Sequence, residues 1–267
     1  MSLLEVRNLV VAFGDKRVVD DVSFDLEAGS RLGIIGESGS GKTLTTLAVM
    51  GLLPDTATVS GSIRFEGEEL LARNDAQMSA LRGNRMGMVF QEPLTSLNPL
   101  MRVGKQIAMP LKIHRGTPIK EGLKIALRLC ETVGLPDPDR IVRSYPHQLS
   151  GGQRQRIGLA IALACDPVLL IADEPTTALD VTVQKEVLKL MNELVSSRGS
   201  SLIFVSHDLP VIASMTESVL VMNTGKVVEH ADVRSLFAAP QHDYSRKLIA
   251  TAKHSDDLFT SFRDGGR

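Results

Sequence analysis

The spacing of apolar and polar positions predicts an α/β chain that is interrupted by a helical stretch. Runs at Leu4–Val11, Val18–Leu26 and Arg31–Ile35 are rich in β-forming residues, which predicts strands. From Val103 to Val133 apolar residues recur at helical spacing, until Gly134-Leu135-Pro136 breaks the pattern. Short apolar runs and helical patterns alternate again after residue 168, which is typical of a parallel sheet with helices between its strands.

Further elements follow from the same patterns. A helix is predicted over Thr43–Leu53 and is expected to stop at Pro54. The other predicted strands are Ser62–Glu66, Met86–Phe90, Val168–Ala172, Leu202–Val205, Val219–Met222 and Val227–Val228. The other predicted helices are Val181–Ser197 and Asp208–Met215, with one more after Ser150 and another after Asp232. We therefore expect one domain over residues 1–252, with a helical insertion at about residues 92–165, and a polar C-terminal tail over residues 253–267.

A glycine-rich stretch, Gly36-Glu37-Ser38-Gly39-Ser40-Gly41-Lys42-Thr43, fits the P-loop pattern G-x-x-x-x-G-K-[ST]. Glycines let the backbone curl closely around phosphate oxygens, and the helix that follows adds its positive N-terminal end. A chance glycine-rich turn is the alternative, but a strand before the stretch and a helix after it favour a phosphate site. The residues predicted to bind nucleotide here are Gly36, Ser38, Gly39, Ser40, Gly41, Lys42, Thr43 and Thr45.

Two adjacent carboxylates, Asp173 and Glu174, end the apolar run Val168–Ala172. Ligands bind at the carboxyl ends of parallel strands, and neighbouring strand residues point to opposite faces, so we expect different roles for the two side chains. Asp173 is predicted to hold Mg²⁺, and Glu174 to polarise the attacking water. On their own they would read as solvated loop carboxylates, but Mg²⁺-nucleotide chemistry requires such a group and the chain has a P-loop.

Composition limits the partners and the compartment. The net charge of -1 gives no sign of an overall basic surface for a nucleic acid, although composition does not exclude a local basic patch, and the 43% hydrophobic content is ordinary for a globular protein. No apolar run approaches the ~18–20 residues that cross a bilayer, and the N-terminus does not resemble a signal peptide. If the protein serves transport, we expect another chain to supply the membrane path. Cys130 and Cys165 are expected to be reduced, buried thiols.

The stretch Leu149-Ser150-Gly151-Gly152-Gln153, ahead of Asp173, resembles the signature of ABC transporter ATP-binding subunits. Ser150 and Gln153 also fit a capping box for the next helix, and we expect both interpretations to hold. The resemblance implies an α/β ABC ATPase fold: a P-loop NTPase core with a parallel sheet, an N-terminal antiparallel β subdomain and an inserted α-helical subdomain. It also implies that Ser150, Gly151, Gly152 and Gln153 face the γ-phosphate of ATP bound to an opposite subunit.

Four other positions match the same family in the same order. The resemblance implies that Phe13 stacks on adenine, and that Gln91 is a Mg²⁺ and water ligand that couples to the membrane partner. Asp180, after Ala178-Leu179, would line the dimer seam, although an N-cap for the next helix is the alternative. His207 would contact the γ-phosphate. The implied metal ligands are Thr43, Gln91 and Asp173, the implied catalytic residues are Lys42, Gln91, Glu174 and His207, and the implied ligands are ATP and Mg²⁺.

Three stretches, Gln91–Pro99, Tyr145–Leu149 and His242–Arg246, resemble the oligopeptide, dipeptide and nickel importer branch. The resemblance implies an ATP-hydrolysing subunit at the cytoplasmic face of the membrane, powering import of peptides, nickel or a related small solute. Its expected partners are permease subunits, a second identical or related ATPase subunit, and a separate solute-binding protein. A soluble ABC-type ATPase acting on nucleic acid or ribosomes is the alternative, and a P-loop kinase or GTPase is a weaker one.

Overall fold

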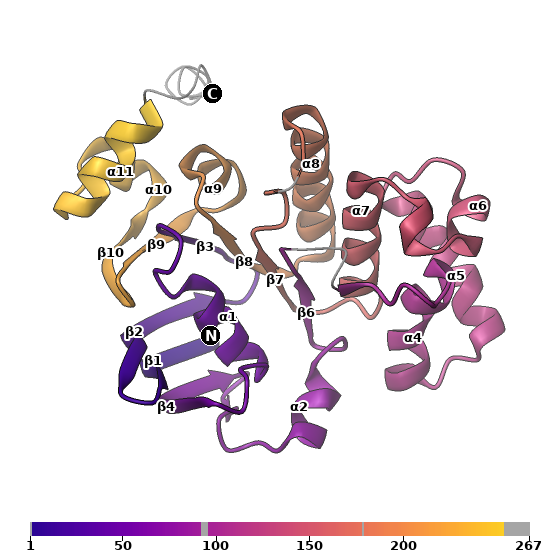
Figure 1. Ribbon diagram of the computed structural model, residues 1–267, viewed down its shortest axis with the longest axis horizontal. Coiled ribbons are helices and arrows are strands. Elements are labelled where there is room, and N and C mark those ends of the chain that lie inside the picture. Colours follow the sequence, from indigo (N-terminus) through magenta and orange to yellow (C-terminus); the bar gives the residue numbers. More distant parts are fainter. Residues whose placement is uncertain (1, 92–95, 178, 254–267) are drawn as a thin grey trace. The chain divides into compact units, whose positions relative to one another are not determined.

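A computed structural model describes residues 2–91, 96–177 and 179–253. The chain forms two compact units, one from residues 1–72 with residues 203–267 and the other from residues 73–202. Figure 1 colours the chain along its sequence, so that the first unit combines indigo to violet elements with orange to yellow ones. Each unit carries part of the predicted chemistry.

An antiparallel sheet forms the N-terminal part of the first unit. Its strands are β1 (Ser2–Phe13), β2 (Lys16–Glu27), β4 (Ala57–Phe65) and β5 (Glu68–Glu69), in the order β2-β1-β4-β5. Val6 of β1 lies opposite Phe24 on one side and Ile63 on the other, and all three side chains are buried. The predicted antiparallel β subdomain is confirmed, although β4 begins five residues earlier than the predicted strand at Ser62.

The second sheet of this unit positions the glycine-rich loop. Its strands lie in the order β10 (Lys226–Asp232), β9 (Ser218–Asn223), β3 (Arg31–Ile35) and β8 (Ser201–Ser206), the last of which belongs to this unit from residue 203 onward. β3 pairs with β9 in parallel, and Ile34 lies opposite Leu220. The helices of the unit are α1 (Lys42–Met50), α9 (Leu209–Met215), α10 (Val233–Ala238) and α11 (Asp243–Lys253).

Helix α1 ends sooner than its sequence predicts. The prediction of a helix to Leu53, stopped by Pro54, is wrong, because Gly51 adopts a left-handed conformation with φ of 60° and caps the helix after Met50. The N–H of Gly51 donates to the carbonyl oxygens of Ala48 and Leu47. Glycine enters this conformation without the steric cost that a β-carbon imposes, so it ends the helix before the proline is reached.

The second unit combines two parallel strands with most of the helices. β6 (Met86–Val89) pairs with β7 (Leu169–Asp173), and every residue of β7 is buried, which accounts for its continuous apolar run. The helical block predicted over residues 92–165 lies within this unit (Figure 1). Its helices, together with those on either side, are α2 (Asp75–Leu81), α4 (Val103–Arg115), α5 (Ile119–Thr132), α6 (Pro138–Arg143), the 3-10 helix η1 (Pro146–Gln148), α7 (Gly151–Ala162) and α8 (Val181–Arg198).

The helical pattern over residues 103–133 is divided between two helices. Gly116 takes a left-handed φ of 64° after Arg115, and Pro118 immediately precedes the first residue of α5. Glycine at the end of one helix and proline just ahead of the next are ordinary helix boundaries. The continuous apolar spacing therefore did not predict the turn between α4 and α5.

Alanine substitution at two glycines of the second unit should have opposite effects on the free energy of unfolding. A β-carbon on Gly87 of β6 would lie 2.5 Å from the carbonyl oxygen of Ala162, whereas one on Gly158 inside α7 would meet no atom within 4 Å. Gly87→Ala should therefore lower the free energy of unfolding by about 1–3 kcal/mol through overpacking. Gly158→Ala should raise it by roughly 0.5–1 kcal/mol, because alanine loses less backbone entropy in a helix. Urea denaturation measures both, and effects of the same sign would contradict the packing described here.

Neither a membrane span nor a disulfide occurs in the described residues. None of the helices in residues 2–91, 96–177 and 179–253 combines the length and the apolar character that a bilayer crossing needs. Cys130 and Cys165 are free and buried, as expected. Burial raises the pKa of the Cys130 thiol to about 12, so it stays protonated and unreactive at neutral pH.

Candidate nucleotide site

The loop between β3 and α1 has a conformation that only glycine permits at several of its positions. A β-carbon on Gly36 would lie 2.2 Å from the carbonyl oxygen of Met222. Gly39 and Gly41 have φ angles of 81° and 97°, in the left-handed region. The backbone thus curls tightly before α1 begins at Lys42, as a loop that surrounds phosphate oxygens requires.

Lys42 is folded onto the loop that precedes it. Its side chain is 5% exposed, and Nζ donates to the carbonyl oxygens of Gly36 at 2.7 Å and of Glu37 at 2.9 Å. The buried hydroxyl of Ser40 finds no hydrogen-bond partner among the described residues. A buried, unpaired hydroxyl inside such a loop fits a ligand that brings its own oxygen acceptors.

The two threonines predicted for this site occupy different environments. Thr43 is exposed in the first turn of α1. Thr45 is buried, and its hydroxyl donates to the carbonyl oxygen of Gly41 at 2.9 Å. Thr45 therefore supports the loop from within the helix.

The two carboxylates of the second unit differ because of a turn in the chain. Asp173 is the last residue of β7 and is 3% exposed. Glu174 follows the strand with a left-handed φ of 44°. The expectation that strand alternation separates the two side chains is therefore wrong: Glu174 is outside the strand, and its unusual backbone conformation redirects its side chain.

Glu174 forms a cluster with two other side chains. Its Oε2 accepts hydrogen bonds from Nε2 of Gln91 at 3.2 Å and from the hydroxyl of Thr177 at 3.0 Å. Gln91 comes two residues after β6, which is the parallel neighbour of β7, so the carboxyl ends of these strands bring it to Glu174. Thr177 was not predicted; its only signal is its place three residues after Glu174, in the same turn.

The predicted capping box at α7 is confirmed. The hydroxyl of Ser150 accepts from the backbone N–H of Gln153 at 3.2 Å, and Oε1 of Gln153 accepts from the N–H of Ser150 at 3.0 Å. Gly151 and Gly152 form the first two positions of the helix, and a β-carbon on Gly152 would lie 2.6 Å from Cγ1 of Val183. The helix start thus presents two glycine N–H groups and the positive end of its dipole, which suit an anion.

The remaining predicted residues lie at the ends of strands and helices. Phe13 ends β1 and is half-buried, and His207 follows β8 and is exposed. Asp180 caps α8, since Oδ1 accepts from the N–H of Val183 at 3.0 Å, which confirms the N-cap alternative. Ala178 lies outside the described residues. The P-loop, Phe13 and His207 belong to the first unit, whereas Gln91, Asp173, Glu174, Asp180 and residues 149–153 belong to the second.

Comparison with known proteins gives a consistent set of relatives. Residues 19–177 match the family described as ABC transporter. The dipeptide transport ATP-binding protein DppD of Lactococcus lactis is 48% identical over 254 residues, which cover 93% of this chain and 73% of the relative. The oligopeptide transport ATP-binding protein OppD of Salmonella typhimurium is 44% identical over 258 residues, covering 95% of this chain and 77% of the relative.

The solved structures that resemble this chain are also ABC proteins by their descriptions. A dimeric, post-hydrolysis state of the ATP-binding cassette MJ0796, bound to ADP and Pi, matches with a TM-score of 0.76 at 27% identity, over 86% of this chain and 99% of that one. The fold is also that of cbiO1 from Clostridium perfringens, part of the transporter complex cbiONQ, with a TM-score of 0.75 at 23% identity, over 98% of this chain and 99% of that one.

Proposed function

This chain belongs to the ABC transporter family. From that premise we propose that it lies at the cytoplasmic face of the membrane and powers the import of peptides into the cell. The predicted family, its ABC ATPase fold and its ATP hydrolysis are confirmed. The named relatives that transport dipeptides and oligopeptides support peptides as the solute over nickel or another small solute. The alternative of an ATPase acting on nucleic acid or ribosomes receives no support from these relatives.

Mg·ATP is the substrate that we propose for the site. The orphaned Ser40 hydroxyl and the left-handed glycines suit phosphate oxygens, and Phe13 would stack on the adenine. Thr43, Asp173 and Gln91 carry hydroxyl, carboxylate and amide oxygens, the donors that Mg²⁺ prefers, and we propose that they hold it. When bound, Mg²⁺ would neutralise charge on the transferring phosphoryl group.

The side chains around Glu174 support a role in hydrolysis. A carboxylate that accepts hydrogen bonds from Gln91 and Thr177 is held in one orientation, as a group that positions water must be. We propose that Glu174 orients the attacking water, that Lys42 stabilises the developing charge, and that His207 contacts the γ-phosphate. Hydrolysis would proceed without a protein phosphoenzyme.

A second ATPase subunit, identical or related, completes the proposed site. The start of α7, with Ser150 to Gln153, would close over ATP bound to the partner subunit, and Asp180 would lie at the same seam. The dimeric state of MJ0796 supports this arrangement. We also propose permease subunits and a separate solute-binding protein as partners.

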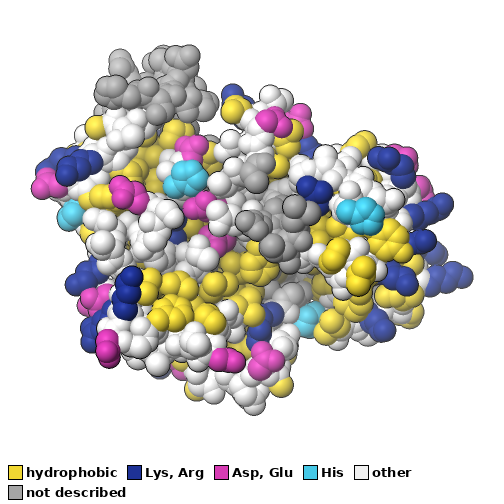
Figure 2. All heavy atoms as spheres, in the orientation of Figure 1, with side chains coloured by type: hydrophobic (Ala, Val, Ile, Leu, Met, Phe, Trp, Pro, Cys, Tyr) yellow, Lys and Arg dark blue, Asp and Glu magenta, His cyan; other side chains and the backbone are white. Residues whose placement is uncertain are grey.

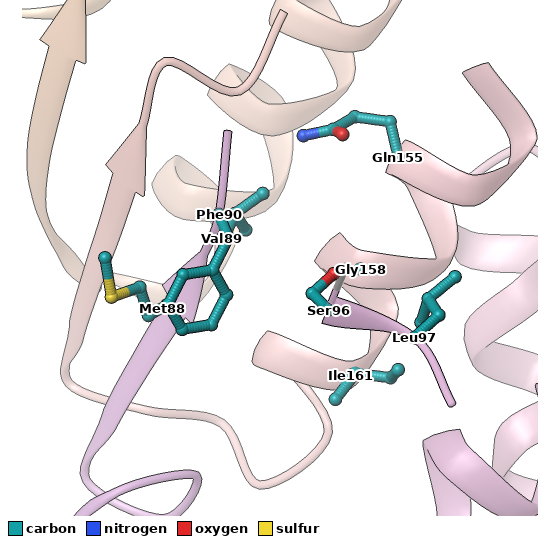
Figure 3. A pocket seen from close by; sticks show the side chains of 8 residues that line it. All are labelled: Met88, Val89, Phe90, Ser96, Leu97, Gln155, Gly158 and Ile161. Carbon is teal, nitrogen blue, oxygen red and sulfur yellow. The ribbon is translucent and has the colours of Figure 1, made fainter. Parts of the chain in front are cut away.

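The hydrogen bond between Gln91 and Glu174 is the observation that carries the proposal of coupled transport. It joins Glu174, which is proposed to orient water, to Gln91. Gln91 comes directly after the exposed residue Phe90, which itself follows β6. Figure 3 shows Phe90 and Met88 of the β6 segment on one side of a small pocket, with Gly158 and Ile161 of α7 on the other. A partner that contacts Phe90 would thus act on the residue next to Gln91, which donates a hydrogen bond to Glu174.

Gln155 gives this pocket an unsatisfied polar group. Its side chain is 2% exposed, it lines the pocket, and Nε2 has no hydrogen-bond acceptor among the described residues (Figure 3). A buried donor without an acceptor costs about 1–3 kcal/mol, so an oxygen-bearing side chain from a permease would be stabilised there. The pocket has a volume of about 70 Å³, which suits one inserted side chain.

A larger pocket of about 590 Å³ lies among α4, α5 and α6. Leu123, Leu127 and Val142 supply its apolar lining, and the cations that line it are Arg102, Lys105, Lys124, Arg128 and Arg143, with Asp139 as the carboxylate. Figure 2 shows Lys and Arg side chains gathered over this end of the unit. We propose that an amphipathic permease segment with acidic residues docks here, since its charges and apolar face would both be matched.

Charge reversal tests this docking surface. Lys124→Glu should weaken co-purification with the permease subunits by about ten-fold or more, because repulsion replaces attraction where the partner is acidic. Lys120→Glu is the matched control, as it makes the same change on the exposed side of α5 outside the pocket. Equal co-purification of the two variants would contradict docking on this surface.

The proposed function itself is tested by reconstitution. This chain, its neighbouring ATPase subunit and the permeases are placed in vesicles, and phosphate release and peptide uptake are measured together. We expect ATP-dependent uptake and hydrolysis without any phosphoryl acceptor. Hydrolysis stimulated by nucleic acid but not by peptide would favour the soluble ATPase alternative, and phosphate transfer to an added acceptor would favour a kinase.

A further inference from the structure

The side chain of Tyr244 on α11 reaches the P-loop from outside it. Its hydroxyl accepts a hydrogen bond from the backbone N–H of Glu37 at 2.9 Å, although 207 residues separate the two in sequence. The carbonyl oxygen of the same Glu37 accepts from Nζ of Lys42 at 2.9 Å. One loop residue is therefore held between the tyrosine hydroxyl and the lysine that the proposed site needs.

The segment that carries Tyr244 is firmly held. The carboxylate of Glu229 on β10 accepts from the N–H groups of Gln241 and His242 at 2.9 and 3.0 Å. Nδ1 of His242 accepts from the N–H of Tyr244 at 3.1 Å. The guanidinium of Arg246 donates to the carbonyl oxygen of Gln241 at 2.8 Å, one turn away. With so many bonds to one short segment, the position of the phenol ring is set by the fold.

The protonation states of Tyr244 and Glu229 favour the observed contacts at neutral pH. Burial raises the pKa of the Tyr244 phenol, which keeps it neutral, and a neutral hydroxyl can accept from Glu37 while retaining its own proton. Burial alone would raise the pKa of the Glu229 carboxyl, but its hydrogen bonds, including those from Gln241 and His242, hold that pKa below its usual value. Glu229 thus remains a charged acceptor, the stronger kind.

We propose that Tyr244 is a positioning residue for ATP binding, whose hydroxyl fixes Glu37 and so presets the entrance of the P-loop. The proposal rests on the P-loop being the ATP site. Glu37 is exposed on the loop, and no other side chain among the described residues would restrain its N–H if the tyrosine hydroxyl were removed. A loop that is already ordered loses less conformational freedom on binding, so the position of α11 influences the affinity for ATP.

Removal of one oxygen atom tests the proposal. Tyr244→Phe should raise the dissociation constant for Mg·ATP by roughly three- to ten-fold, the effect of one neutral hydrogen bond. In the reconstituted transporter KM should rise by the same factor with kcat unchanged, because Tyr244 touches no reacting group. Tyr145→Phe, at the only other tyrosine of the chain, is the matched control and should leave the affinity as in the wild type.

The tyrosine content also supplies a direct signal. The chain has two tyrosines and no tryptophan, so in the Tyr145→Phe variant Tyr244 is the sole source of tyrosine fluorescence. Adding Mg·ATP should change that fluorescence, and the ATP concentration at half of the change should equal the concentration at half-maximal binding measured by calorimetry. The change should vanish when Lys42 is also replaced by alanine, because nucleotide then no longer occupies the loop.

The anchor of the segment gives a second variant. Glu229→Gln should raise the ATP dissociation constant in the same direction, and combining it with Tyr244→Phe should add little, since both act through one contact. An affinity of Tyr244→Phe equal to that of the wild type, or fully additive effects in the double variant, would overturn the inference. Failure of the wild-type chain to bind Mg·ATP would instead contradict the proposed function.

Discussion

Replacing Lys42 with alanine is expected to lower ATP hydrolysis by about 10²–10³-fold, the usual effect of removing one group that stabilises transition-state charge. The substitution removes the only cation of the loop Gly36–Thr43. Its ammonium donates to two loop carbonyl oxygens, and the residue is 5% exposed. Phosphate release by the reconstituted transporter measures the loss.

Lys112→Ala, on the exposed surface of α4, is the matched control for Lys42→Ala and should leave the rate unchanged. Thermal unfolding of both variants in the absence of nucleotide separates a chemical defect from a folding defect. Retention of more than a third of wild-type hydrolysis in a folded Lys42→Ala variant would show that the loop does not bind the transferring phosphates.

Glu174→Gln should lower kcat by about 10²–10⁴-fold while ATP still binds, because glutamine keeps the shape of the side chain but cannot act as a base. Gln91 and Thr177 both donate to Oε2 of Glu174, and an amide oxygen at the same place can accept both bonds. The local geometry should therefore survive. ATP bound without hydrolysis should then hold two subunits together.

Light scattering with and without Mg·ATP detects that state. The Glu174→Gln chain is expected to shift from monomer to dimer when Mg·ATP is added, and the shift should disappear when Lys42→Ala is also present. Glu193→Gln, which makes the same change at an exposed position of α8, serves as the control and should hydrolyse ATP normally. If Glu174→Gln binds ATP and stays monomeric even with the neighbouring ATPase subunit added, the shared site is contradicted.

Local patterns in the sequence predicted the elements that depend on local rules. β3 runs over Arg31–Ile35 as predicted, since a short apolar run leading into a glycine-rich loop has few other interpretations. The capping box of Ser150 and Gln153 was also readable, because both partners lie within one turn. Helix α2 was missed, as it is short, buries only Met78 and carries little periodic signal.

Contacts between distant segments could not be predicted from the residues. Gln91 and Glu174 are 83 residues apart, and Glu37 and Tyr244 are 207 apart. Gln91 and Glu174 meet at the ends of neighbouring parallel strands, and Glu37 meets a residue of helix α11, and no local pattern encodes either meeting. The left-handed φ of Glu174 belongs to the same class, since it is imposed by the surrounding fold on a residue type that does not favour it.

The buried ammonium of Lys42 also bears on the stability of the folded chain. An isolated cation removed from water would destabilise the fold by several kcal/mol. Here the carbonyl oxygens of Gly36 and Glu37 accept hydrogen bonds from the ammonium and replace part of its lost hydration. The loop that is proposed to bind phosphate thus also solvates its own cation, so a change in the path of its backbone would weaken the fold as well as the site.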